Sequence, residues 1–113
     1  MIKMRGDEGD FNDIDTSDIE SMESLFKYNK KFNGDITGWN VSSVRDMGSM
    51  FYGAKSFNQP IGNWVFPNVI DMRSMFSGAT SFDQDLSKWD LSKKAKLGIF
   101  DGCHIKDEYK PKM

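Results

Sequence analysis

The sequence predicts an α/β fold: a short right-handed, leucine-rich-repeat-like solenoid of about four coils, each with a short parallel strand and a short α- or 3-10 helix. Two observations support this prediction. Large apolar residues return every 25 residues along the 113-residue chain. Within each copy, a polar stretch with spaced apolar residues is followed by apolar residues at helical spacing. A fixed period is typical of proteins whose units stack, because one short unit cannot bury its apolar face alone.

Self-comparison of the chain gives the boundaries of the copies. Residues 32–56, 57–81 and 82–105 align, with one residue missing from the last copy, and residues 1–31 form a degenerate first copy. Residues 106–113 make a polar tail, and we expect all of 1–113 to be a single solenoid domain. The matching apolar positions are Phe32, Phe57 and Phe82, then Ile36, Ile61 and Leu86, then Trp39, Trp64 and Trp89.

The first part of each copy is expected to hold the strand. Between Phe32 and Trp39, apolar and polar residues alternate loosely, as on a half-buried strand. Pro60, in the next copy, has no N–H to donate to a neighbouring strand. The predicted strand is therefore short.

The second part of each copy is expected to hold the helix. From Val44 to Phe51, apolar residues follow the i, i+3, i+6 and i+7 spacing of a short amphipathic helix. Ser43 precedes this run as a helix N-cap would. Gly53 and Gly78 follow the equivalent runs, where a left-handed residue ends many helices.

The end copies depart from the pattern as caps would. Asp7 stands where the second copy has Phe32, and Lys93, Lys94 and Lys96 crowd the second part of the last copy. Polar outer faces keep a short stack soluble. Even so, free ends leave end-to-end self-association open.

Bulk composition narrows the function classes. A net charge of −2 and a pI near 5.3 argue against a nucleic-acid partner. No run approaches the length of a membrane-spanning helix, and the first ten residues lack the apolar stretch of a secretory signal, so a cytoplasmic location is the default expectation. One cysteine and one histidine leave few catalytic or metal-binding sets to assemble, and the expectation is a protein without enzyme activity or cofactors.

The recurring pattern Phe-Asn-x-x-Ile-x-x-Trp-x-Val-x-x-Val-x-x-Met-x-x-Met-Phe-x-x-Ala resembles the BspA-like leucine-rich-repeat surface proteins. The resemblance covers roughly residues 11–105, and the segment from Asp15 to Phe26 resembles the lead-in copy of that family. It implies a parallel-stranded leucine-rich-repeat architecture, and an association with bacterial surfaces, adhesion and protein–protein contact. It carries no catalytic or metal-binding residues, and it would place the protein at the cell surface.

The leading functional hypothesis is a non-catalytic protein–protein interaction module. A polar stripe along the strand side is the candidate partner-binding face, because solvated polar side chains repeat there at the period of the copies. Its residues are Asn33, Asp35, Thr37, Asn58, Asp83, Asp85 and Ser87. A metal bound by the same oxygens is a weaker alternative, since no complete calcium-loop spacing is present.

Two further hypotheses come from other classes. Bacterial surface adhesion or carbohydrate binding would use an exposed row of Trp39, Trp64 and Trp89 as a stacking platform, although residues at the repeat period are more often core. An enzyme would have to use Cys103 with His104. Cys103 follows Gly102 as alanines follow Gly53 and Gly78, so a structural thiol is the favoured interpretation.

Overall fold

The computed structural model describes residues 9–111, and the secondary structure that it contains differs from the prediction. The start of the first copy, with Asp7, and the end of the polar tail lie outside the described residues. Within 9–111 the one helix is the 3-10 helix η2, Asp107–Tyr109. No extended strand forms within these residues, and neighbouring segments pair only through isolated β-bridges. The prediction of an α/β solenoid whose coils each carry a strand and a helix is therefore wrong.

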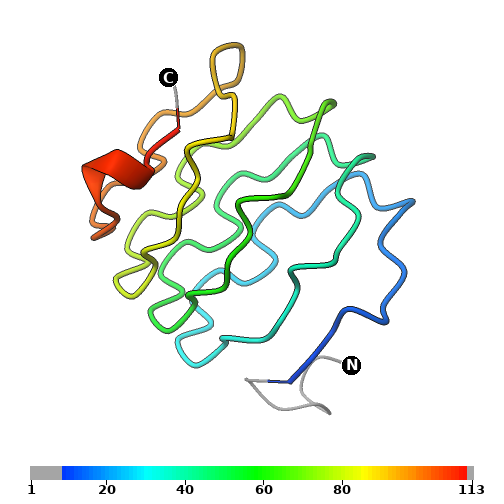
Figure 1. Ribbon diagram of the computed structural model, residues 1–113, viewed down its shortest axis with the longest axis horizontal. Coiled ribbons are helices and arrows are strands. Elements are labelled where there is room, and N and C mark those ends of the chain that lie inside the picture. Colours follow the sequence, from blue (N-terminus) through cyan, green and yellow to red (C-terminus); the bar gives the residue numbers. More distant parts are fainter. Residues whose placement is uncertain (1–8, 112–113) are drawn as a thin grey trace.

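Successive copies of the repeat nevertheless lie side by side (Figure 1). Parallel bridges join Asp10 to Asp35 in the first part of the copies. In the second part they run from Ser21 to Asp46, from Asp46 to Asp71 and from Asp71 to Ala95. We call residues 9–31, 32–56, 57–81 and 82–105 the first, second, third and last repeats. Figure 1 shows the first repeat in blue at one end and the last repeat, with η2 in red, at the other.

The segment predicted to be helical is a run of overlapping turns. We call residues 21–29, 46–54, 71–79 and 95–103 the turn segments. In the second repeat, the N–H groups of Met50, Tyr52 and Ala54 donate to the carbonyl three residues earlier, at 3.0–3.3 Å. The intervening N–H groups of Met47, Ser49, Phe51 and Gly53 donate instead to carbonyls of the third repeat, at 2.8–2.9 Å.

Left-handed residues make this alternation possible. Ser49 has a φ of 55° and Gly53 a φ of 67°. A left-handed residue at the third position of a turn reverses the direction of the chain, as in a type II turn. A right-handed residue at that position would let the chain continue as a helix. The prediction that Gly53 and Gly78 are left-handed is confirmed, but they sit inside turns rather than at the end of a helix.

The predicted strand from Phe32 to Trp39 is reduced to one bridge residue. Asp35 donates its N–H to the carbonyl of Gly9 at 2.8 Å, and the N–H of Phe11 donates to the carbonyl of Asp35 at 2.9 Å. Pro60 occupies the position equivalent to Asp35 and has no N–H, so this pairing cannot be repeated by the third repeat. Polar side chains join the repeats there instead.

The core consists of two adjacent columns of phenylalanine rings. Phe26, Phe51, Phe76 and Phe100 follow one another with centroids 5.4–5.8 Å apart. Phe32, Phe57 and Phe82 form the second column, with nearly parallel rings 5.9–6.0 Å apart. The methionines of the turn segments and the three tryptophans are buried beside them, which confirms that Met47, Met50, Met72, Met75, Trp39, Trp64 and Trp89 belong to the core.

Candidate functional site

Three of the predicted partner-binding residues form a column that holds the repeats together. We call Asn33, Asn58 and Asp83 the polar column. The Asn33 Oδ1 accepts the N–H of Asn58 at 2.8 Å, and the Asn58 Oδ1 accepts the N–H of Asp83 at 2.9 Å. Gln59 and Gln84 add amide donors to the Asn33 and Asn58 oxygens, at 3.0–3.2 Å.

The polar column continues into the C-terminal segment. An Asp83 carboxylate oxygen accepts the N–H of Lys106 at 3.0 Å, and the Lys106 ammonium pairs with its other oxygen. The hydrogen bond from the Lys106 side chain is the main cause that lowers the pKa of Asp83 below its usual value, and the Lys106 N–H adds to it. The carbonyl of Tyr109, in η2, accepts the N–H of Leu86 at 2.9 Å. The C-terminal segment therefore covers the first part of the last repeat.

The other predicted residues close local turns. The Asp35 Oδ1 accepts both the N–H and the hydroxyl of Thr37, at 3.0 and 2.7 Å, and the Asp85 Oδ1 accepts the N–H of Ser87 at 2.9 Å. The hydrogen bonds from the N–H and hydroxyl of Thr37 lower the pKa of Asp35. The Ser87 side chain, and then its N–H, lower the pKa of Asp85 in the same way. The third repeat has Pro60 and Gly62 at the equivalent positions. The predicted residues thus lie on one side of the molecule, with many of their oxygens engaged within the chain, and their role in binding a partner stays a prediction.

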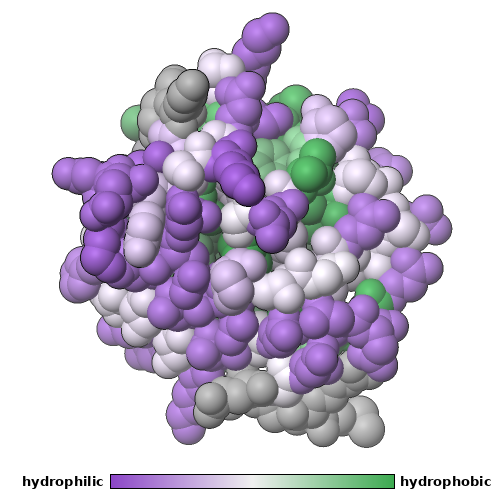
Figure 2. Space-filling view, in the orientation of Figure 1, coloured by the Kyte–Doolittle hydropathy of each residue, from purple (hydrophilic) through white to green (hydrophobic). Residues whose placement is uncertain are grey.

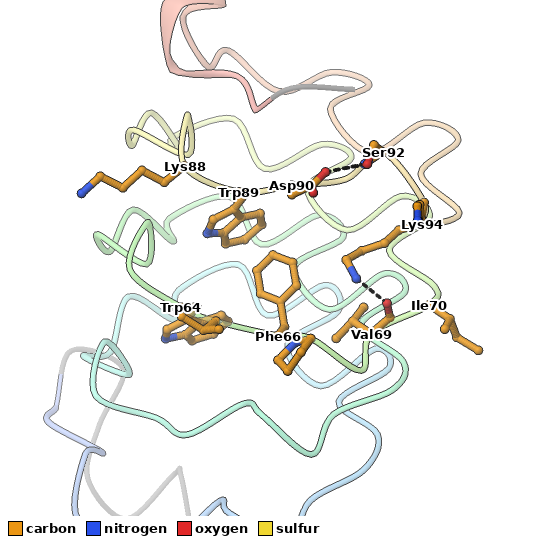
Figure 3. Close-up of a pocket in the computed structure, with 12 residues that line it drawn as sticks. Trp64, Phe66, Val69, Ile70, Lys88, Trp89, Asp90, Ser92 and Lys94 are labelled. Carbon is orange, nitrogen blue, oxygen red and sulfur yellow. Dashed lines mark hydrogen bonds between the residues drawn. The ribbon is translucent and has the colours of Figure 1, made fainter.

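A groove between the third and last repeats combines apolar and charged groups. Its volume is about 480 Å³. Trp64, Phe66 and Trp89 form its floor, with Phe66 and Trp89 in an edge-to-face contact at 4.8 Å. Val65 and Ile70 line it as well and are 73% and 65% exposed. Figure 3 shows the Phe66 ring between Trp89 and the Lys94 side chain.

Departures from the repeat create this groove. Val65 stands where the second repeat has Asn40, and Ile70 stands where it has Arg45. In the last repeat, Lys94 is equivalent to Val69, and the next residue, Ala95, forms a bridge with Asp71. The last repeat therefore lacks a residue equivalent to Ile70. The equivalent residues of the second repeat, Asn40 and Arg45, are exposed as well. The third repeat therefore differs in placing apolar side chains at exposed positions. Comparing the copies position by position would have found this signal.

Lysines surround the apolar part of the groove. Lys88 and Lys93 are exposed at its edge. The Lys94 ammonium donates to the carbonyl of Val69 at 2.6 Å and lies 5.5 Å from the centroid of the Phe66 ring. One carboxylate, that of Asp90, lines the groove and accepts the N–H and the hydroxyl of Ser92. In the space-filling view, hydrophobic side chains gather in a hollow rimmed by hydrophilic ones (Figure 2).

Trp64, one of the two tryptophans beneath this groove, differs from Trp39 and Trp89 in its hydrogen bonding. The indole N–H of Trp39 donates to the carbonyl of Phe11 at 3.0 Å, and that of Trp89 donates to the carbonyl of Ile61 at 3.3 Å. The same register would pair Trp64 with Ile36, but the Trp64 N–H is buried without a partner. A buried donor without an acceptor costs on the order of 1–3 kcal/mol.

Cys103 and His104 show no catalytic arrangement within the described chain. The Cys103 thiol is half-buried and donates to the carbonyl of Phe82 at 3.6 Å. Burial raises the pKa of this thiol, which disfavours the reactive thiolate. His104 is exposed, and no hydrogen bond joins it to Cys103.

A second, more polar hollow lies over the turn segments. It measures about 600 Å³ and is lined by carboxylates of successive repeats, including Asp46, Asp71 and Asp101. Arg73 donates to both Asp71 oxygens at 2.8–3.1 Å and lowers the pKa of that carboxyl group. Among residues 9–111, no group of three or more acidic, histidine or cysteine side chains is placed to hold a metal ion.

Comparison with known families gives one match, which spans residues 2–108. The chain belongs to the family described as "Mycoplasma protein of unknown function, DUF285". No curated protein and no solved structure matches it. The family description assigns no activity, so the resemblance to BspA-like proteins stays a prediction. In the part of this DUF285 member that the structure describes, no helix has the length and apolar character needed to cross a bilayer.

Proposed function

We propose that this DUF285 protein is a non-catalytic protein–protein interaction module, and that the groove between its third and last repeats binds an extended segment of a partner protein. The segment would place an apolar side chain against Val65 and Ile70 and carboxylates near Lys88. The observation that carries the proposal is the exposure of Val65 and Ile70 beside a lysine-rimmed hollow.

Physical chemistry supports this kind of partner. Burying the exposed parts of two aliphatic side chains contributes on the order of 2–4 kcal/mol before the costs of association. The lysines at the edge favour an acidic segment over a basic one, and they act mainly on specificity and association rate. The Ser92 hydroxyl of the groove lies against the Asp90 carboxylate, but the same carboxylate oxygen also accepts the N–H of Ser92, as in a local turn.

The alternative of adhesion through glycans receives less support. A sugar platform needs open aromatic faces, whereas Trp39, Trp64 and Trp89 are 7%, 5% and 3% exposed. Stacking of sugar rings on this row would require the core to open. An adhesive role through protein contacts remains compatible with the proposed groove.

The test is selection of a displayed random-peptide library on the folded chain, followed by affinity measurement. The matched control replaces Val65 by Asn and Ile70 by Arg, the residues of the second repeat, so it should fold normally. We expect selected peptides to combine an aliphatic or aromatic residue with flanking Asp or Glu. Their affinity should fall at least about tenfold on the double variant, which is 1.4 kcal/mol, and several-fold on Lys88→Glu. Selection of no peptide, or equal binding to the double variant, would contradict the proposal.

A further inference from the structure

The hydrogen bonds between turn segments all point the same way along the stack. Four N–H groups in each of the first three repeats donate to carbonyls of the following repeat, at 2.7–3.0 Å. Met22, Ser24, Phe26 and Tyr28 are the donors of the first repeat. Just before these donors, one bond per junction runs the other way, from the N–H of Arg45, Ile70 or Ala95 to the preceding repeat. Because four bonds run forward and one backward, the two ends of the ladder differ chemically.

The ends of the ladder are left open within residues 9–111. In the last repeat, the equivalent N–H groups have no acceptor among the described residues; they belong to Lys96, Gly98, Phe100 and Gly102. Ladder carbonyls of the later repeats accept from the preceding repeat, but those at the same positions of the first repeat accept from no described residue. These carbonyls belong to Ser21, Glu23, Leu25 and Lys27. One end thus presents a row of donors and the other a row of acceptors with the same spacing.

Apolar side chains at both ends are less covered than their counterparts in the middle. Ile19 and Leu25 of the first repeat are 37% and 43% exposed, whereas Val44 and Met50 at the same positions of the second repeat are fully buried. Phe100 of the last repeat is only partly buried, whereas Phe76 is fully buried. A further repeat placed against either end would bury these side chains.

Two exposed positions beside the ladder carry opposite charges at the two ends, whereas Asp90 and the equivalent Asp15 are acidic at both. Lys93 of the last repeat is equivalent to Asp18 of the first, and Asp101 is equivalent to Lys27; all four are exposed. The second and third repeats carry uncharged residues at these positions: Ser43 and Asn68, then Tyr52 and Ser77. Opposite charge therefore occurs where a second copy would meet the first, and not between neighbouring repeats of one chain.

We propose that this protein associates with itself head to tail, the turn segment of the last repeat of one copy pairing with that of the first repeat of the next. The contact would extend the ladder by four backbone hydrogen bonds and pair Lys93 with Asp18 and Asp101 with Lys27. Because the two surfaces differ, the contact is heterologous and produces linear oligomers rather than a closed two-fold dimer. It does not use the apolar side chains of the groove, although Lys93 lies at the edge of both surfaces.

Sedimentation velocity over a range of protein concentrations tests this, with two charge-reversed variants. The first carries Asp18→Lys and Lys27→Asp, and the second carries Lys93→Asp and Asp101→Lys. Neither changes the net charge, and every substitution is at an exposed position. We expect concentration-dependent growth of the unmodified chain, weakened by salt. Each variant alone should associate at least about tenfold more weakly, because like charges then face each other.

A mixture of the two variants distinguishes a head-to-tail contact from a contact between two identical patches. In an alternating oligomer, each junction regains opposite charges, so a one-to-one mixture should associate within about threefold of the unmodified chain. A contact between two identical patches would not be restored in this way. An unmodified chain that stays monomeric up to roughly 1 mM, where even weak complexes form, would overturn the proposal. So would association that neither variant weakens, or a mixture that gains nothing. Circular dichroism of each variant checks that it is folded.

Discussion

The two parts of each repeat are joined to their neighbours by different chemistry. The turn segments are joined by backbone N–H and carbonyl groups, which every residue except proline supplies. From the second repeat onward, the first parts are joined by the polar column, in which a side-chain oxygen of Asn33, Asn58 or Asp83 takes the place of a backbone acceptor. The turn segments should therefore tolerate changes of exposed side chains, and the first parts should not tolerate losing the column oxygens.

The largest difference is expected from shortening the central residue of the polar column. Asn58→Ala leaves the Asp83 N–H without its acceptor and removes one of the two oxygens that accept from the Gln84 amide, which keeps the backbone carbonyl of residue 58. We expect the free energy of unfolding to fall by about 1–3 kcal/mol. Asn58→Asp keeps the oxygen, as Asp83 does naturally, and should cost under about 1 kcal/mol. Urea unfolding followed by tryptophan fluorescence measures both.

The matched change in a turn segment is Arg73→Ala. It removes an exposed ion pair with Asp71, and such pairs contribute under about 1 kcal/mol. If Arg73→Ala proved as costly as Asn58→Ala, the distinction between the two modes of joining would be wrong.

The tryptophans at the end of the first parts allow two positions to be compared that differ in the hydrogen bonding of the indole N–H. Trp39→Phe loses ring atoms and the hydrogen bond to the Phe11 carbonyl, whereas Trp64→Phe loses ring atoms and an N–H that has no partner. Trp64→Phe should therefore cost about 1–2 kcal/mol less than Trp39→Phe.

The same urea assay decides this prediction. Trp89→Phe serves as a second reference, since the Trp89 N–H also has an acceptor. Equal losses at all three positions would mean that the Trp64 indole finds an acceptor in solution.

Sequence reasoning reached the repeat positions and the core but not the local conformation. Apolar residues such as Met47, Met50 and Phe51 carry the same spacing in an α-helix and in overlapping turns, because both place side chains three residues apart on one face. The difference lies in Ser49, whose left-handed conformation nothing in its side chain requires. Packing of the neighbouring repeats favours that conformation.

The candidate site was missed for a related reason. The residues predicted to bind a partner, such as Asn33 and Asn58, are ones that the repeats share, and they recur because they join the repeats. Val65 and Ile70 are departures from the pattern, because they place apolar side chains where the second repeat has the exposed Asn40 and Arg45. Features that recur in this chain describe how it is held together, whereas those that occur once indicate where it could bind.

The smallest expected effect concerns the left-handed serines of the turn segments. Ser74 has a φ of 57°, which costs a non-glycine residue about 1–2 kcal/mol. Gly98 occupies the equivalent position of the last repeat, so glycine fits the turn. Ser74→Gly removes that cost but makes the unfolded chain more flexible, by about 0.5–1 kcal/mol. The net expectation is a gain of about 0.5–1 kcal/mol.

Ser87→Gly, in the first part of the last repeat, is the matched control, because the φ of Ser87 is not left-handed. The added flexibility of the unfolded chain and the loss of the Ser87 side-chain hydrogen bond to Asp85 both act there, so stability should fall by at least about 0.5–1 kcal/mol. Thermal unfolding of the two variants should shift in opposite directions. A shift in the same direction would show that the left-handed turns carry no strain, and that the turn segments adopt this conformation without cost because each turn gains a backbone hydrogen bond to the next repeat.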